Sequence, residues 1–179
     1  MLLVDFQIAA RCRGNLMVKP FDEDLINPAS LDVRLGSVIK VETHLSSELE
    51  FFDIGSYTEE FPYHLAPGQF ILAETLESFA LPEDICAQFV LKSSRAREGL
   101  DHLNAGWCDC GWGLSVDGEE RRSVLTMELK NARQLQSVKL WPGMKIGQLK
   151  FIALDQVPLS SYAVTGRYNG DMSVQSSKG

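Results

Sequence analysis

The sequence has few of the residues that cross-link small proteins or bind metals. It contains four cysteines and three histidines in 179 residues. The cysteines are too few and too scattered for a disulfide framework, so we expect reduced thiols at Cys12, Cys86, Cys108 and Cys110. A chain of this length can bury enough surface to fold as a single domain without a disulfide or a structural metal.

The sequence also lacks an excess of positive charge and a long apolar run. Lysine and arginine number 17 against 24 aspartates and glutamates, which gives a net charge of −7. Because nucleic-acid-binding proteins usually carry a basic excess or stripe, we expect no nucleic-acid partner. No stretch of about 18 apolar residues could span a membrane, and the N-terminus lacks the pattern of a secretory signal. We therefore expect no membrane partner and a cytoplasmic location.

Short apolar runs separated by glycine and proline turns dominate the chain, which predicts a mostly β fold. Residues 31–35 alternate apolar and polar side chains, Gly36-Ser37 predicts a turn, and residues 38–41 predict the next strand. Further strands are expected at 51–54, 70–76, 85–91, 124–129, 138–141 and 146–154. This pattern favours a barrel or a sandwich rather than a parallel sheet.

Two short helices and a tail complete the expected organisation. Residues 5–12 predict a helix that Gly14 ends, and the polar stretch 92–99 predicts a second short helix, entered through Ser93 or Ser94. We expect one domain over residues 1–165. Residues 166–179 have no apolar period, which predicts a flexible tail unless a ligand or a neighbouring subunit holds it.

Hydroxyls and cations gather at the start of the second predicted helix. Lys92, Ser93, Ser94 and Arg97 could bind a phosphate, because backbone N–H groups at a helix start and nearby cations both attract anions. The alternative is an ordinary helix cap followed by a solvated turn, and spacing alone favours that alternative.

A second candidate region places one carboxylate, Asp109, between Cys108 and Cys110, close to His102. This arrangement invites a metal-site interpretation. Zinc deaminases, however, carry an H-x-E motif and a later P-C-x-x-C motif, and neither occurs here. We therefore expect no zinc, and we expect Cys108 and Cys110 to be small side chains on one face of a strand.

The third candidate is an acidic residue within a predicted strand. Alternation along 124–130 puts Thr126, Glu128 and Lys130 on one face and the apolar side chains on the other. Glu128 could be an ordinary solvent-facing glutamate, which is the better interpretation of the strand taken alone. Alternatively, it is a general base in a dry pocket.

Five stretches, taken in order, match motifs of one known family. They are DVRLG at 32–36, APGQF with TLE at 66–77, SSRAREGL at 93–100, PGMKIGQL at 142–149 and GRYNG at 166–170. Together they resemble the dCTP deaminase family, a branch of the trimeric dUTPase fold. The resemblance runs almost from end to end and favours the functional interpretations given above.

The resemblance implies a homotrimer of distorted, jelly-roll-like β-barrels of the dUTPase-like fold, with active sites between subunits and a tail that closes over the nucleotide. It implies zinc-independent hydrolytic deamination of dCTP to dUTP and ammonia in pyrimidine deoxynucleotide metabolism. One alternative is a bifunctional enzyme that also cleaves dUTP to dUMP and diphosphate, which AGWCD at 105–109 favours. The other is a non-catalytic, nucleotide-binding regulatory homologue. A deoxycytidine nucleotide is the expected ligand, with dTTP as a candidate feedback ligand.

The family's functional residues carry over to specific positions. Glu128, Ser93 and Arg97 match the catalytic set, with Glu128 taking a proton from the water that attacks C4 of cytosine. Asp109 matches the aspartate that meets the sugar 3′-hydroxyl. The remaining expected nucleotide-binding residues are Lys92, Ser94, Trp112, Thr126, Tyr162, Arg167, Tyr168 and Asp171. The resemblance implies no protein metal ligands, with Mg²⁺ carried on the nucleotide phosphates.

The sequence departs from the family pattern at several positions. Leu91 and Cys110 stand where the family commonly has glycine and proline. A longer stretch precedes the predicted catalytic strand, and Asp117-Gly118 within it predicts a protruding hairpin. Asp171 stands where a phosphate-contacting glutamine is expected. Because a carboxylate facing a triphosphate is unfavourable, these departures bear on the substrate more than on the fold.

Overall fold

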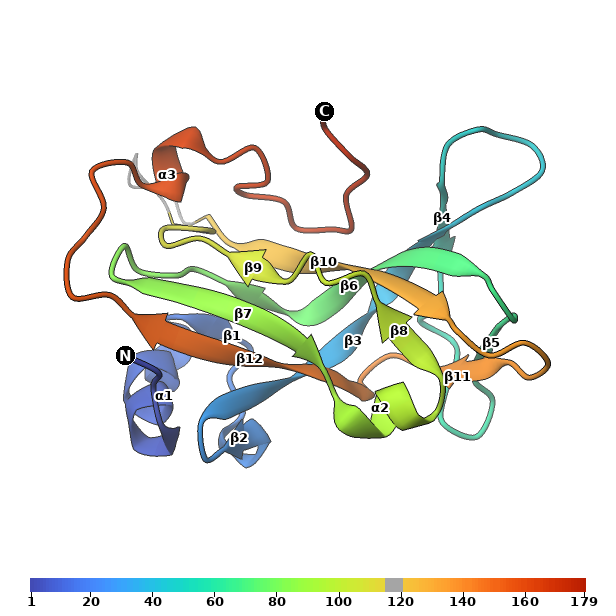
Figure 1. Cartoon of the computed structure of the whole chain (residues 1–179), viewed down its shortest axis with the longest axis horizontal. Coiled ribbons are helices and arrows are strands. Elements are labelled where there is room, and N and C mark those ends of the chain that lie inside the picture. The colour runs from blue at the N-terminus through green and yellow to red at the C-terminus, as the bar shows by residue number, and fades with distance from the viewer. Residues whose placement is uncertain (115–120) are drawn as a thin grey trace.

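The computed structural model describes residues 1–114 and 121–179, and the expected hairpin at 117–118 lies outside the described residues. Most of the regular secondary structure in the described chain is β-strand (Figure 1). Ten strands form one sheet: β1 (Val18–Lys19), β2 (Ile26–Asn27), β3 (Ser30–Val41), β4 (Glu50–Asp53), β6 (Phe70–Phe79), β7 (Ile85–Leu91), β8 (Leu100–His102), β9 (Trp107–Cys108), β10 (Ser123–Asn131) and β12 (Lys145–Ala153). A separate pair consists of β5 (Tyr63–Leu65) and β11 (Val138–Leu140).

The large sheet curls back on itself. Its strand order is β8-β10-β6-β3-β12-β7-β9, so β8 and β9 are at opposite ends of the path. Residues 103–106 alone connect these two strands, so the two edges of the sheet must lie close together. The result is an antiparallel, barrel-like fold, which confirms the expected mostly β architecture.

The helices are short and few in the described part of the chain. They are α1 (Asp5–Cys12), α2 (Ser93–Arg97) and α3 (Tyr162–Thr165), with two 3₁₀ turns at Arg13–Asn15 and Glu23–Leu25. The helix expected over 5–12 is confirmed, and Gly14 beyond its end has a positive φ of 73°. None of these helices is long and apolar enough to cross a bilayer.

The turn expected at Gly36-Ser37 is wrong, because β3 runs without interruption through both residues. Instead, its pairing with β6 shifts register between Leu35 and Ile39. A Cβ atom at Gly36 would lie 2.5 Å from Cγ of Glu74, so only glycine allows β3 to approach β6 at this point. The glycine therefore marks a bulge in the strand rather than the end of a strand.

The barrel interior is apolar and continuous across the sheet. Fully buried side chains come from neighbouring strands, among them Ile39 of β3, Ile71 of β6, Met127 of β10 and Phe151 of β12. Burial alternates along β10, where Thr126 and Glu128 are half-buried between fully buried neighbours. The two faces expected for this strand are confirmed, and the face with Glu128 is the one that meets the cavity described below.

A buried ion pair ties β3 to β6 inside the barrel. Glu77 is fully buried, and its carboxylate accepts hydrogen bonds from the backbone N–H of Arg34 at 2.8 Å and from the Arg34 guanidinium at 2.7 Å. The Arg34 side chain is 22% exposed. This pair uses the Arg of the DVRLG motif and the Glu of the TLE motif, which gives both motifs a structural role.

Replacing Glu77 with leucine is expected to lower the free energy of unfolding by about 3 kcal/mol, because it removes the buried partner of the Arg34 guanidinium and leaves only the more exposed carboxylate of Asp22, 4.0 Å away. Urea unfolding followed by circular dichroism measures this change. The double variant Arg34→Met, Glu77→Leu is the matched control and should recover much of the loss. An unchanged urea midpoint in the single variant would show that the pair does not stabilise the fold.

Candidate active site

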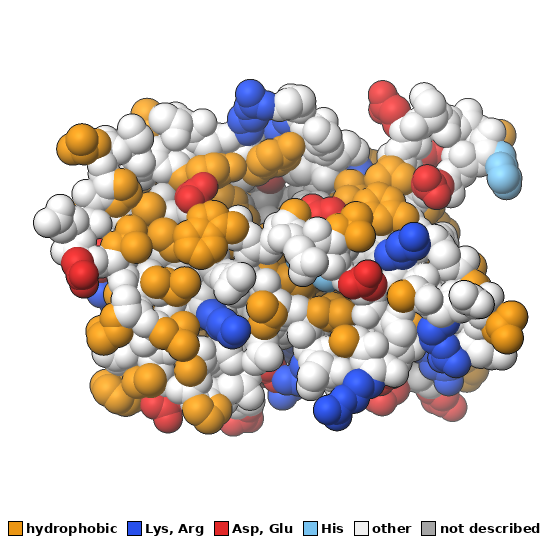
Figure 2. All heavy atoms as spheres, in the orientation of Figure 1, with side chains coloured by type: hydrophobic (Ala, Val, Ile, Leu, Met, Phe, Trp, Pro, Cys, Tyr) orange, Lys and Arg blue, Asp and Glu red, His pale blue; other side chains and the backbone are white. Residues whose placement is uncertain are grey.

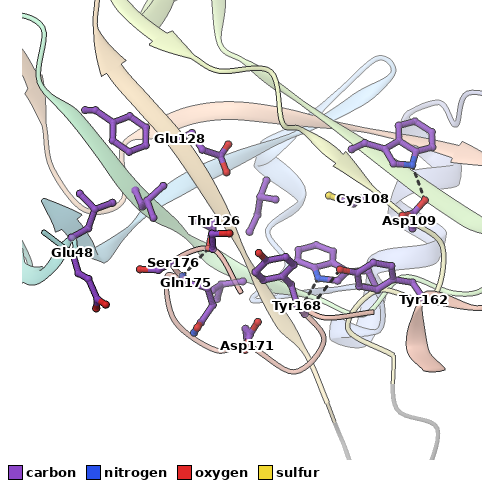
Figure 3. A pocket seen from close by; sticks show the side chains of 18 residues that line it. Glu48, Cys108, Asp109, Thr126, Glu128, Tyr162, Tyr168, Asp171, Gln175 and Ser176 are labelled. Carbon is purple, nitrogen blue, oxygen red and sulfur yellow. Dashed lines mark hydrogen bonds between the residues drawn. The ribbon is translucent and has the colours of Figure 1, made fainter. Parts of the chain in front are cut away.

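A cavity of about 760 Å³ opens between β10, the loop after β9 and the C-terminal segment (Figure 3). Hydrophobic side chains border the hollowed part of this face, with acidic side chains among them (Figure 2). The cavity brings together several of the residues expected from the sequence: Asp109, Trp112, Thr126, Glu128, Tyr162, Tyr168 and Asp171. Residues from three distant parts of the chain therefore share one site.

Glu128 projects from the polar face of β10 into this cavity (Figure 3). One carboxylate oxygen, Oε2, is buried without a hydrogen bond and lies 3.4 Å from Nε2 of His102. Nδ1 of His102 accepts the backbone N–H of Asn104 at 3.3 Å, so in the neutral ring the proton is on Nε2 and faces Glu128. Glu128 therefore has one oxygen held near a histidine N–H while its side chain, 26% exposed, borders the open cavity.

Asp109 lies just beyond the end of β9 and is held by a neighbouring tryptophan. The indole N–H of Trp107 donates to Oδ1 of Asp109 at 2.8 Å (Figure 3). Trp107 itself is 54% exposed and lines the cavity. The hydrogen bond orients the carboxylate and leaves Oδ2 able to accept a hydrogen bond from a ligand hydroxyl.

Aromatic side chains connect the C-terminal segment to the loop after β9. Trp112 is buried, stacks on Phe79 at a centroid distance of 5.6 Å, and donates its indole N–H to the carbonyl of Tyr168 at 3.0 Å. The hydroxyl of Tyr162 accepts the backbone N–H of Tyr168 at 3.4 Å. Trp112 and Tyr162 thus form the wall that holds Tyr168, and with it the segment 166–179, over the cavity.

The carboxylate of Asp171 is paired within its own segment. Nζ of Lys178 lies 2.6 Å from Oδ2 of Asp171 and also donates to the carbonyl of Arg167 at 2.9 Å. The same ammonium lies over the ring of Tyr168, 5.1 Å from its centroid. Lys178 therefore offsets the negative charge that made Asp171 an unfavourable neighbour for a triphosphate.

The residues of the α2 region do not line this cavity. Ser93 and Arg97 are exposed, while Lys92 forms an ion pair with the buried Asp32, 2.6 Å from each carboxylate oxygen. The expected cap at Ser93 or Ser94 is wrong: Lys92 occupies the N-cap position, with extended backbone angles and no side-chain cap. The helix begins directly at the end of β7, so both serines fall inside its first turn. Arg167, which was also expected at the site, is exposed and is not part of the cavity lining.

The two cysteines near Asp109 do not share a strand. β9 ends at Cys108, and Cys110 lies in the turn that follows, so the expectation of one strand face for both is wrong. Burial raises the pKa of the Cys108 thiol to about 12 and that of Cys86 to about 11, so both stay protonated at neutral pH. All four cysteines are free. Within residues 1–114 and 121–179, no three His, Cys, Asp or Glu side chains form a metal-binding group.

Sequence reasoning missed Trp107, His102 and the cavity-lining residues 175–177 of the C-terminal segment. Trp107 was visible within AGWCD, but its contact with Asp109 depends on the turn after β9. His102 was considered only as a metal ligand, although a histidine on a strand that pairs with β10 could have been placed beside Glu128. The polar segment 175–177 carries no local signal for its position.

Comparisons with known proteins identify the family of this chain. The model of a family described as dCTP deaminase-like matches residues 2–154. The chain is 41% identical over 164 residues to the dCTP deaminase, dUMP-forming, of Methanoculleus marisnigri, which covers 87% of this chain and 82% of that protein. It is 37% identical over 191 aligned positions to the protein of the same name from Rhodococcus opacus, covering 99% of this chain and 96% of that one.

A solved structure supports the fold. The 2′-deoxycytidine 5′-triphosphate deaminase from Agrobacterium tumefaciens superposes with a TM-score of 0.61 at 23% sequence identity. The alignment covers 84% of this chain and 47% of that chain, so the present chain spans about half of its length. Because the family model covers most of the chain and two relatives exceed 30% identity over 82% and 96% of their length, this chain belongs to the dCTP deaminase family of enzymes.

Proposed function

We propose that the protein converts dCTP to dUMP, ammonia and diphosphate. The observation that carries the proposal is the cavity in which Glu128 and Asp109 lie within one site, in a chain 36–41% identical to relatives named dUMP-forming dCTP deaminases. The sequence alone favoured dUTP as the end product. The names of the relatives support the bifunctional alternative more than that first prediction.

Glu128 would act as the general base in the deamination. A water molecule beside Glu128 would give a proton to the carboxylate while its oxygen attacks C4 of the cytosine ring. The proton would pass to N3, which gives a tetrahedral intermediate with a hydroxyl and an amino group on C4. Glu128 would then carry the hydroxyl proton to the amino group, so that the C4–N bond breaks, ammonia leaves and the C4 carbonyl forms. The His102 N–H near Oε2 would steady the ionised carboxylate between these steps.

Asp109 would hold the sugar of the nucleotide through its 3′-hydroxyl. Its free oxygen Oδ2 would accept the 3′-hydroxyl, while Trp107 fixes the orientation of the carboxylate through Oδ1. A carboxylate held by a fixed donor discriminates strongly, because a ligand that lacks the matching hydroxyl leaves a polar group unpaired.

The phosphate chain would extend towards cations contributed by α2 and the C-terminal segment. Ser94 and Arg167 would contact phosphate oxygens directly, and Lys92 would do so while sharing its charge with Asp32. Mg²⁺ would arrive as part of the substrate, bound to its phosphates. The segment 166–179 would close over the bound nucleotide. A second water placed in line with the α-phosphorus would then cleave the bond to the β-phosphate, so that one dCTP and two waters give dUMP, ammonia and diphosphate.

The active unit would be a homotrimer. Ser93 and Arg97 match the catalytic set of the family but are exposed and lie outside the cavity that holds Glu128 of the same chain. A neighbouring subunit that presents its α2 to this cavity would complete the site. Closed cyclic assembly makes all three such sites equivalent.

Incubation with dCTP and Mg²⁺, followed by anion-exchange separation of dCTP, dUTP and dUMP, tests the proposed reaction. The expected result is direct appearance of dUMP with no accumulation of free dUTP, and cleavage of dUTP supplied as a parallel substrate. Accumulation of dUTP that stays uncleaved would instead identify a deaminase without diphosphatase activity. No product from either nucleotide would contradict both reactions and favour a binding-only role.

A further inference from the structure

A buried carboxylate outside the expected catalytic set holds the C-terminal segment. Glu74 lies in the middle of β6 with 9% of its surface exposed. Its Oε2 accepts the backbone N–H of Val174 at 3.0 Å, and the side chain of Ser173 also hydrogen-bonds to the carboxylate. Glu74 therefore accepts hydrogen bonds from two adjacent residues of the C-terminal segment.

The strand next to Glu74 supplies a second acceptor. Thr126 of β10 is the cross-strand partner of Glu74, and its hydroxyl accepts the backbone N–H of Gln175 at 3.1 Å. Two paired residues of the barrel thus accept the N–H groups of two successive residues of the segment. The side chain of Val174, the first of these two residues, is completely buried.

This contact determines where the end of the chain lies relative to the site. Residues 175–177 follow Val174 directly and line the cavity that contains Glu128, which is two residues beyond Thr126 on the same face of β10 (Figure 3). A further tether joins Nζ of Lys40 to the hydroxyl of Ser176 at 2.8 Å. The segment is therefore fixed at the point where it enters the cavity wall.

Glu74 loses most of its contact with water when it is buried in the barrel, which costs free energy of hydration. Burial raises the pKa of its carboxyl group above the ordinary value of a glutamate, and the hydrogen bonds from Val174, Ser173 and Val38 offset part of that rise. Glycine at position 36 provides the space for this side chain. Two of its three donors, Val174 and Ser173, come from a distant segment, so this buried carboxylate beside a glycine serves to bind that segment.

We propose that Glu74 is a positioning residue for the reaction: with Thr126 it holds residues 173–175 against the barrel and thereby sets residues 175–177 over the nucleotide. The effect on turnover rests on the proposed function, whereas the anchoring itself does not. The anchoring can be measured on the unliganded protein.

Hydrogen exchange and steady-state kinetics of Glu74→Leu test the proposal. Without the acceptor, the backbone amides of residues 170–178 should exchange at least about tenfold faster, because a hydrogen bond to a charged group is lost. KM for dCTP should rise by about tenfold, with kcat changing less than KM. Glu74→Gln keeps an acceptor oxygen for Val174 and should recover most of both effects. Val174→Pro removes the backbone donor and the buried valine side chain from the segment while every residue of the barrel is kept. It should reproduce the faster exchange even if Glu74→Leu does not fold.

A truncated background separates an anchor from a general structural role. In a chain that lacks residues 173–179, Glu74→Leu should cause no further rise in KM, since both of its donors from the segment are already absent. Additive effects of the truncation and the substitution would overturn the proposal, as would unchanged exchange of the segment in both Glu74→Leu and Val174→Pro. Faster exchange with an unchanged KM would also overturn it. Wild-type protein without turnover of dCTP would contradict the proposed function alone, because the exchange experiment needs no substrate.

Discussion

Glu128→Gln is expected to reduce ammonia release from dCTP by a factor of at least about 10³, while nucleotide binding stays close to that of the wild type. Glutamine has the size of glutamate but cannot take a proton from water, so the attacking nucleophile is no longer generated. Both groups can occupy the same position on β10 beside His102, so the shape of the cavity is kept. A coupled assay for ammonia and calorimetric titration with dCTP measure the two quantities separately.

The substitution should also separate the two proposed reactions. Cleavage of dUTP occurs at the α-phosphorus and does not need a base at C4, so Glu128→Gln should retain much of its dUTP hydrolysis. Glu23→Gln is the matched control, since Glu23 is an exposed carboxylate paired with Arg13 at 3.0 Å, and should leave both reactions near wild type. Retained ammonia release in Glu128→Gln would remove Glu128 from the mechanism.

Most of the strands could be predicted because their signals are local. The apolar run 85–91 coincides with β7, and the alternation along β10 gave the correct face for Glu128. The error at Gly36-Ser37 has a clear physical cause. Glycine followed by serine is typical of a turn. Here the glycine is required by close packing against another strand, because the side chain of Glu74 occupies the space where a Cβ would be. No window of sequence around position 36 contains that information.

The candidate site was predictable in its residue types but not in its arrangement. Motif matching identified Glu128 and Asp109, which the structure brings into one cavity. It gave no means of foreseeing that Lys178 pairs with Asp171, or that Glu74 receives the N–H of Val174 from 100 residues away. These contacts depend on how the C-terminal segment crosses the barrel, and the segment has no apolar period of its own. Backbone N–H groups hold this segment to buried side chains, and nearly every residue type supplies such a group. The position of the segment therefore cannot be predicted from its own sequence.

Mixed trimers of two inactive variants are expected to recover activity. Glu128→Gln and Arg97→Ala should each be inactive as homotrimers, because every site then lacks one catalytic group. If each site takes Glu128 from one subunit and Arg97 from its neighbour, every trimer that contains both variants has both groups intact at about one site in three. Co-expression with two affinity tags, followed by the ammonia assay on doubly purified trimers, measures the recovery.

The matched control for complementation is the pair Arg97→Ala and Ser93→Ala. Both residues lie on α2 of one chain, so every site in such mixed trimers receives a helix with one of the two defects and activity should stay absent. Arg97→Ala should therefore recover activity when mixed with Glu128→Gln but not when mixed with Ser93→Ala. That outcome assigns α2 and β10 of one site to different subunits. If Glu128→Gln and Arg97→Ala assemble together without recovery, the site is built within one chain, and α2 must then move towards β10 when the nucleotide binds.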